Sequence, residues 1–165
     1  DSLFVRDPKS GPLLRIQSMR KGTLKSPGIL RDSGFSVSVK SFPEIPSTHS
    51  LTKHEGDEFR LEVRIKNTSG QDLENLAATT WLPAGWILRN DPHAQWERPI
   101  RHVDRRADRI VHHFDLASGR EAVLRIPLRA LQEGSYQGPE VVVEALYDNA
   151  LRGHWKGPRA RVEHR

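Results

Sequence analysis

The sequence of 165 residues contains no cysteine. Disulfide bonds, thiolate catalysis and zinc sites with cysteine ligands are therefore excluded. No apolar run approaches the roughly 20 residues that a helix needs to cross a bilayer, and the N-terminus lacks the order of basic, apolar and small residues typical of a signal peptide. The chain starts at Asp1 and not at methionine. We therefore expect a piece of a longer protein, with no direct membrane span.

Helical periodicity and the motifs of common enzyme classes are also missing. The sequence has no G-x-S-x-G nucleophile elbow, no P-loop, no Rossmann glycine fingerprint and no H-E-x-x-H zinc helix. It has no internal repeat and no low-complexity segment. These absences favour a non-enzymatic protein that holds no cofactor.

The dominant pattern is an alternation of apolar and polar residues with period two, which indicates strands with one buried face. The clearest example places Phe59, Leu61, Val63 and Ile65 between charged residues. Strands are expected near residues 13–19, 35–41, 58–66, 75–81, 100–104, 109–116, 121–131, 139–147 and 159–163. Residues 20–34 and 42–56 are expected to be connecting loops.

Turn residues rather than helices separate these segments, and this spacing is typical of an antiparallel β-sandwich. The sequence therefore predicts an all-β fold of seven to nine strands with little or no helix. It predicts one domain over 1–165, in which 1–12 form a linker. Pro127 lacks a backbone donor and is expected at a sheet edge or a bulge. The strand at 139–147 is apolar on both faces, and we expect it to be central.

The charge pattern favours structural ion pairs. The net charge is +5, but the basic residues alternate with Asp and Glu along most of the chain, so no nucleic-acid partner is expected. Asp104 and Asp108 lie among arginines, which stabilise ionised carboxylates and make them poor general acids. The predicted salt-bridge network comprises Asp104, Arg105, Asp108, Arg109, Asp148 and Arg152. Within it, we expect Asp108 to pair with the neighbours of Arg109 or with Arg152.

The histidines raise the question of a metal site. His112 and His113 are adjacent, so on a strand they point to opposite faces. His102, Asp104, His113 and Asp115 could converge across a hairpin as nitrogen and oxygen ligands. Surface and boundary histidines on a strand are the favoured interpretation, and no metal is predicted. A metal-dependent enzyme using His102, His113 and Asp115 is the third hypothesis.

The tryptophans suggest a binding surface, because aromatic rings are favoured at interfaces. Trp81 ends an alternating strand and is expected in the core. Trp86 and Trp96 flank the loop at 87–98 and are expected to be exposed. The predicted interaction surface comprises Trp86, Trp96, Arg98 and Arg101. A stand-alone adhesion or carbohydrate-binding sandwich that uses Trp86 and Trp96 is the second hypothesis. Asn67-Thr68-Ser69 matches a glycosylation sequon, but it also reads as a turn.

Three segments carry a resemblance to a known family. Residues 75–90 read NLAATTWLPAGWILRN, residues 102–116 read HVDRRADRIVHHFDL, and residues 124–153 read LRIPLRALQEGSYQGPEVVVEALYDNALRG. In this order they resemble the C-terminal macroglobulin domain of bacterial alpha-2-macroglobulins. The family's M-Y-D-P turn reads Leu146-Tyr147-Asp148-Asn149 here, and Glu140 replaces its second proline, which affects a loop but not the fold.

The resemblance implies a non-catalytic domain of a periplasmic protein that traps proteases, with a parent that can be lipid-anchored to the inner membrane. The family's thioester needs a cysteine, so this chain has none. The implied partners are other domains of the parent, target proteases, a penicillin-binding protein or small operon-encoded proteins.

Overall fold

The computed structural model describes residues 2–5, 14–17, 33–43, 50–89 and 99–164. The chain divides into two compact units, residues 1–30 and 31–165. In the first unit, β1 (Ser2–Val5) pairs with β2 (Leu14–Gln17) as an antiparallel hairpin. Residues 2–5, which the sequence predicted to lie in a linker, thus form a strand.

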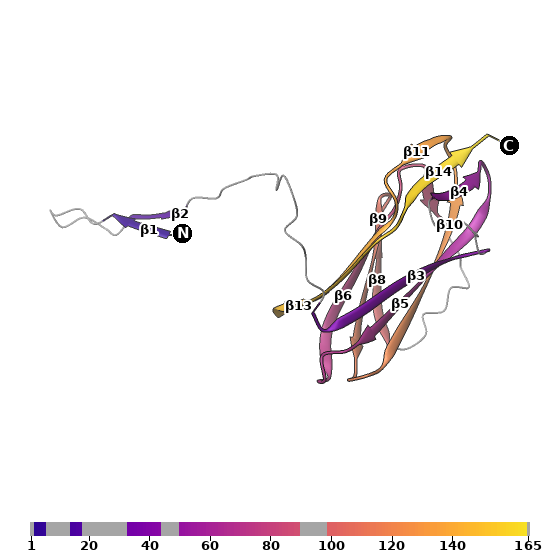
Figure 1. Ribbon diagram of the computed structural model, residues 1–165. Coiled ribbons are helices and arrows are strands. Elements are labelled where there is room, and N and C mark those ends of the chain that lie inside the picture. The colour runs from indigo at the N-terminus through magenta and orange to yellow at the C-terminus, as the bar shows by residue number, and fades with distance from the viewer. Residues whose placement is uncertain (1, 6–13, 18–32, 44–49, 90–98, 165) are drawn as a thin grey trace. The chain divides into compact units, whose positions relative to one another are not determined.

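The second unit is a β-sandwich, and the prediction of an all-β antiparallel fold is confirmed (Figure 1). The described residues contain no helix. The strands of this unit are β3 (Phe35–Phe42), β4 (Ser50–His54), β5 (Glu58–Asn67), β6 (Leu73–Trp81), β7 (Trp86–Leu88), β8 (Ile100–Arg105), β9 (Arg109–Leu116), β10 (Glu121–Ala130), β11 (Gly134–Tyr136), β12 (Glu140–Ala145), β13 (Asp148–Lys156) and β14 (Arg159–Glu163).

A four-stranded sheet has the order β3-β5-β10-β7, and a five-stranded sheet has the order β13-β12-β6-β9-β8. A smaller sheet, β11-β14-β4, includes the parallel pair β14 and β4. Small side chains let the elements approach where β13 meets β3. A Cβ added to the buried Gly153 would lie 2.8 Å from the Cβ of Phe35.

The core lies between the inner faces of the two large sheets. Its fully buried side chains include Leu61, Val63 and Ile65 from β5 and Leu124, Ile126 and Leu128 from β10. These residues follow the period-two alternation of the sequence, which places every second side chain on the same face. The five-stranded sheet contributes Leu76, Ile110, Phe114, Val141 and Val143.

Several strand boundaries differ from the prediction. The loop expected at 42–56 contains β4, which pairs with β14. The strand expected at 139–147 ends at Ala145, where the register shifts, and the chain turns at 146–147 into β13. The remainder of that strand is central, as expected, because β12 lies between β13 and β6.

The prediction that Pro127 lies at a sheet edge or a bulge is wrong, because β10 lies between β5 and β7 and pairs with β5 without a register shift. Pro127 lies just beyond the residues of β10 that pair with β7. Its strand pairs with β5 along nearly its full length but with β7 only at residues 128–130. The carbonyl of Pro127 accepts a hydrogen bond from the Arg89 amide at 3.0 Å. Its missing donor therefore interrupts no strand pair.

Candidate functional site

The outer face of the five-stranded sheet has an apolar centre. The register places Val142 beside Thr79, and Thr79 beside Val111, on three adjacent strands. Val142, Thr79 and Val111 are half-buried, and Ala77 lies two residues from Thr79 on the same face of β6. We call Ala77, Thr79, Val111 and Val142, with Trp81 at the end of β6, the apolar strip.

Charged and polar pairs border the apolar strip. On one side, His154 Nε2 lies 2.7 Å from Glu140 Oε1, and Arg152 Nη2 lies 3.3 Å from Glu144 Oε1. At the end of the strip, the Arg109 guanidinium lies 4.3 Å from the centroid of the Trp81 ring. An apolar centre with a polar rim is the usual anatomy of a protein interface.

The outer face of the four-stranded sheet is charged instead. We call it the basic face; its cations on β3, β5 and β10 are Lys40, Arg60, Arg64, Lys66, Arg125 and Arg129, and its carboxylates are Glu58, Glu62 and Glu121. Glu62 is only 6% exposed although it points outward. Arg64 Nη2 contacts its carboxylate at 2.6 Å, and Arg125 Nε lies 3.9 Å from it. The hydrogen bond and charge of Glu62 raise the pKa of Arg64.

The turn between β12 and β13 presents the two most exposed of the large apolar side chains among the described residues. Tyr147 is 88% exposed and Leu146 is 51% exposed. The amide of Leu146 donates to the carbonyl of Asn75 at 3.1 Å, and Asn75 has a φ of 55°. Residues 146–149 belong to a segment that carries the family resemblance, but they lie outside the predicted interaction surface, because a turn has no alternation from which exposure can be predicted.

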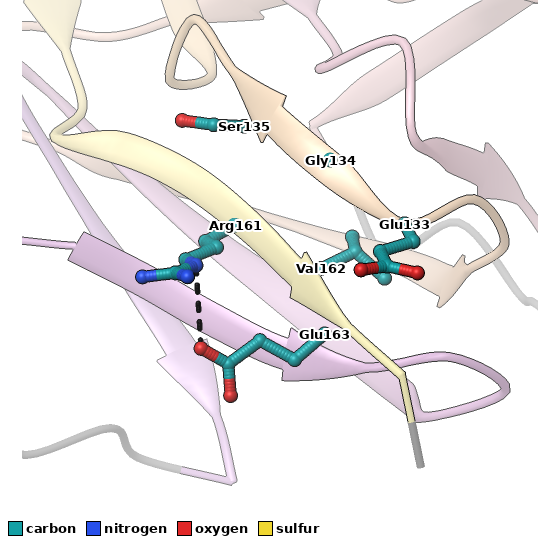
Figure 2. Close-up of a pocket in the computed structure, with 6 residues that line it drawn as sticks. All are labelled: Glu133, Gly134, Ser135, Arg161, Val162 and Glu163. Atoms are coloured by element: carbon teal, nitrogen blue, oxygen red, sulfur yellow. Dashed lines mark ion pairs between the residues drawn. The ribbon is translucent and has the colours of Figure 1, made fainter.

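A shallow cavity of about 370 Å³ lies beside β11 and β14 (Figure 2). Its lining includes Glu133, Ser135, Arg161 and Glu163, and Arg161 Nε lies 3.3 Å from Glu163 Oε1. The one cation is therefore paired with a carboxylate of the same lining. The cavity presents no cluster of groups suited to catalysis.

His102 and His113, considered above as metal ligands, do not converge with further ligands on a metal site in the described part of the chain. His102 and His113 are paired across β8 and β9, with ring centroids 5.9 Å apart. No group of three or more potential ligands is found among the residues that the structure describes. His113 lies on the outer face, whereas His112 is fully buried, so the two adjacent rings point to opposite faces as predicted.

Two titratable groups of the sandwich interior have shifted pKa values. Burial lowers the pKa of His112 to about 4, and the positive charges of Arg105 and His113 act in the same direction. Burial also lowers the pKa of Lys53, against the opposing charge of Asp57. The Lys53 Nζ atom lies 4.6 Å from the centroid of the Phe59 ring. A neutral His112 suits a structural role in the core.

The predicted positions of two tryptophans are wrong. Trp86 is 2% exposed and packs edge-on against Phe59, with ring centroids 4.8 Å apart. Trp81 is 38% exposed, because the inward positions of β6 are Leu76, Ala78 and Thr80. The predicted platform of Trp86 and Trp96 therefore loses Trp86. Trp96 and Arg98 lie outside the described residues. Arg101 is exposed and forms an ion pair with Asp115.

The predicted salt-bridge residues form local pairs. Asp104 accepts from Arg106 Nε at 3.0 Å, and Asp108 Oδ1 lies 3.7 Å from Arg109 Nε. The Asp148 side chain accepts from the amide of Ala150 within its own turn. Arg105 lies near the buried His112 ring, and its positive charge helps to lower the pKa of His112.

The expected pair of Asp108 with Arg152 is wrong. Arg152 is opposite Glu144, which lies in one row with Ala77 and His113. Asp108 immediately precedes β9 and lies five residues before His113 of that row. At about 3.3 Å per residue, the two side chains belong to opposite ends of the sheet. The ion-pair partner of Arg152 is Glu144, which the sequence did not predict.

The sequon at Asn67 is a structural turn. Asn67 is fully buried, and its Nδ2 donates to the carbonyls of Leu116 and Gln71, both at 2.8 Å. Its Oδ1 accepts from the amide and the hydroxyl of Ser69. Both polar atoms of the Asn67 side chain are engaged within the turn and with β9, so glycosylation of Asn67 would break this network.

Comparison with known proteins gives one consistent family. Residues 34–149 match the domain family described as Bacterial Alpha-2-macroglobulin MG10 domain. An alpha-2-macroglobulin of Xylella fastidiosa is 36% identical over 111 aligned residues, in a match that covers 56% of this chain and 7% of that protein. An alpha-2-macroglobulin of Rickettsia conorii is 25% identical over 103 aligned residues, in a match that covers 56% of this chain and 5% of that protein. The chain thus spans less than a tenth of the curated relatives that it matches.

Solved structures agree on the fold. The native alpha-2-macroglobulin of Escherichia coli, in a structure from domain MG7 to the C-terminus, superposes with a TM-score of 0.72 at 21% identity. That match covers 86% of this chain and 25% of the other. A pilin subunit of Bacillus cereus, BcpA, matches at a TM-score of 0.53 and 11% identity, over 96% of this chain and 51% of the pilin. In the part of the chain that the structure describes, no helix is long and apolar enough to cross a membrane.

Proposed function

Because this chain belongs to the MG10 domain family of bacterial alpha-2-macroglobulins, we propose that it is a non-catalytic, C-terminal packing and docking domain of a longer protease-trapping protein. The family resemblance stated from the sequence is confirmed by this match. A macroglobulin domain is a structural module, and its task in this proposal is to hold one surface rigidly against a neighbouring domain or partner protein.

The observation that carries the proposal is the apolar strip on the five-stranded sheet. An outer sheet face in contact with water usually carries polar residues at every second position. Here Val142 and Val111 occupy such positions, and the exposed Trp81 ring adjoins them. Tryptophan and arginine are the residue types most often found at energetic hot spots of interfaces, and Trp81 and Arg109 stack on each other at the edge of this strip.

The proposed partners are the other domains of the parent protein. Target proteases, a penicillin-binding protein and small operon-encoded proteins are further candidates for the same docking role. The proposed compartment is the periplasm, with the parent held at the inner membrane by a lipid anchor. No cofactor enters the proposal, and a thioester would have to come from another domain, because this chain has no cysteine.

Oxidative footprinting of Trp81 tests the proposal directly. The chain alone and the full-length protein that contains it are exposed to hydroxyl radicals, and oxidation of Trp81 is quantified by mass spectrometry. We expect Trp81 to be oxidised several-fold more slowly in the full-length protein, because a neighbouring domain covers the strip. Equal oxidation rates in both proteins would contradict the proposal.

A matched pair of variants separates docking from folding. Val142→Arg places a charge in the strip, whereas Ser38→Arg places the same charge at an exposed position of β3 on the other large sheet. In the full-length protein, we expect Val142→Arg to accelerate limited proteolysis between domains, whereas Ser38→Arg behaves as the wild type. Thermal melts of the chain alone check that both variants fold.

A further inference from the structure

We propose that the basic face of the four-stranded sheet binds an acidic protein segment that presents several carboxylates at once. This surface lies on the other large sheet from the apolar strip (Figure 1). The inference goes beyond the proposed function, because a chain that failed to pack on its parent would still carry this face.

The first observation is the concentration of charge. The strands β3, β5 and β10 place six cations and three carboxylates on one face, an excess of three positive charges. The whole chain has a net charge of +5. More than half of the net charge of the protein therefore lies on one side of one sheet, which produces a local field that attracts anions.

The second observation is that a buried carboxylate of the same face holds one of these arginines in position. Glu62 lies at the centre of the face, opposite Arg125 on β10 and Lys40 on β3. Its carboxylate receives Arg64 Nη2 at 2.6 Å and Nε at 2.9 Å. A buried carboxylate thus holds the Arg64 side chain against the sheet, which lowers the entropy that the arginine would lose on binding.

The third observation concerns the remaining cations. Lys40, Arg60, Lys66 and Arg129 form no ion pair with another of the described residues. Arg60 instead stacks on the Phe42 ring, with the guanidinium 5.1 Å from the ring centroid. A guanidinium that lies on an aromatic ring keeps its N–H donors available for a carboxylate at its edge.

The pattern of the face favours a protein over a polyanion of uniform charge. The exposed Glu58 and Glu121 lie within the face, paired with Arg89 at 3.2 Å and with Arg64 at 3.0 Å. They interrupt the positive charge that would face the closely spaced phosphates of a nucleic acid or an anionic membrane. Val123 and Pro127 are half-buried between the arginines and offer apolar contact. Mixed apolar and arginine surfaces are typical of protein interfaces, and a protein segment can place its own cations or polar groups opposite Glu58 and Glu121.

Fluorescence anisotropy of the chain with an acidic probe tests the inference. The probe is a labelled peptide of about ten residues that alternates glutamate and threonine, at an ionic strength of about 50 mM, where surface charges are weakly screened. The test variant is the triple substitution Lys40→Gln, Arg60→Gln and Arg129→Gln. We expect its affinity to fall about tenfold, because three unpaired cations are lost.

The matched control removes three exposed cations elsewhere, through Arg106→Gln, Lys156→Gln and Arg159→Gln. Both variants have the same net charge, so the control is expected to lose less than about twofold in affinity if position matters. The single variant Arg129→Gln should also bind the peptide more weakly than the wild type. Equal losses in test and control, or no binding by the wild type, would overturn the inference.

Two further probes decide the class of partner. Duplex DNA and vesicles of phosphatidylglycerol are titrated under the same conditions. The inference expects both to bind more weakly than the peptide. Tighter binding of either one would overturn the assignment to a protein partner. None of these outcomes depends on Trp81, so they separate this inference from the proposed function.

Discussion

The two large sheets of the sandwich divide polar and apolar residues in different ways. The four-stranded sheet is strongly amphipathic, with aliphatic residues of β5 and β10 inside and the basic face outside. The five-stranded sheet has the buried polar side chains His112 and Thr80 on its inner face and valines on its outer face. A strand that is apolar on both sides is typical of a sheet covered on both faces. The two outer faces therefore suit different environments, an apolar neighbour for the five-stranded sheet and an anionic one for the four-stranded sheet.

The largest expected effect comes from two adjacent valines on β12. Val143 is fully buried and Val142 lies in the apolar strip. We expect Val143→Asp to lower the free energy of unfolding by more than about 4 kcal/mol, because it buries an unpaired charge. Val142→Asp should cost less than about 1 kcal/mol in the chain alone, because water still reaches its position. Urea denaturation of both variants measures the difference.

The two valine variants also test whether the outer face of the five-stranded sheet lies outside the folded core. If the outer face of the five-stranded sheet were part of the folded core of the chain, Val142→Asp would destabilise the chain as strongly as Val143→Asp. Val123→Asp on the basic face is the control, since Val123 is half-buried between cations. There the new carboxylate meets Arg64 as its cross-strand neighbour, so we expect no loss of stability.

The second effect concerns the buried His112. Its pKa is about 4 in the folded chain and about 6.5 in an unfolded one. Between these two values the unfolded chain binds a proton that the folded chain does not, so stability is lost as the pH falls from 6.5 to 4. At 1.36 kcal/mol per unit of pKa, the loss is roughly 3 kcal/mol.

Chemical denaturation as a function of pH measures this loss, with His112→Leu as the comparison. The variant should lack the part of the pH dependence that His112 causes, whereas His113→Leu, on the outer face, should retain it. A stability profile that is the same for the wild type and His112→Leu between pH 6.5 and 4 would show that the ring is not kept neutral. The nearby charges of Arg105 and His113 are included in this expectation, since both oppose protonation of His112.

The third effect is on the basic face. Glu62→Gln removes a buried negative charge that two arginines share, and we expect a loss of about 1–2 kcal/mol. Glu121 is the control, because it contacts Arg64 Nη1 at 3.0 Å but is well exposed. Surface pairs contribute about 0–1 kcal/mol, so Glu121→Gln should cost less. Thermal unfolding at low and high salt measures both, and equal losses would mean that the burial of Glu62 has no energetic consequence.

The strongest sequence patterns predicted the fold where alternation was uninterrupted. Residues 58–66 were predicted nearly to the residue, because large apolar and charged side chains alternate there. The bounds predicted for 109–116 are those of β9, although Val111 and His112 break the alternation. In β6 the run Ala77, Ala78, Thr79 and Thr80 does not show which residues face the core, since residues of similar size and polarity lie on both faces of the strand. This ambiguity led to the wrong placement of Trp81 in the core. Trp86 was expected to be exposed because it flanks the loop at 87–98, but it is buried in β7.

The surfaces could be predicted less well than the strands. Asp108 and Arg152 lie at opposite ends of the five-stranded sheet, and their separation follows from strand order and register, which the sequence alone does not give. β13 was missed because its residues Asp148 to Lys156 show little apolar alternation. Without β13, neither the partner of Arg152 nor the edge of the apolar strip could be identified.

The smallest expected effect is the coupling between Trp81 and Arg109, the pair at the end of the apolar strip. The guanidinium lies 4.3 Å from the ring centroid, and both side chains are partly exposed, so a double-mutant cycle of Trp81→Ala and Arg109→Ala should give about 0.5–1 kcal/mol. Trp81 and Arg60 lie on different sheets, and the same cycle for them should be additive. In the presence of a covering domain the coupling should rise, because desolvation strengthens a cation–π contact. An interaction energy of zero for Trp81 and Arg109 would mean that the stacked arrangement is no more stable than separate solvated side chains, and the strip would then lose its proposed hot spot.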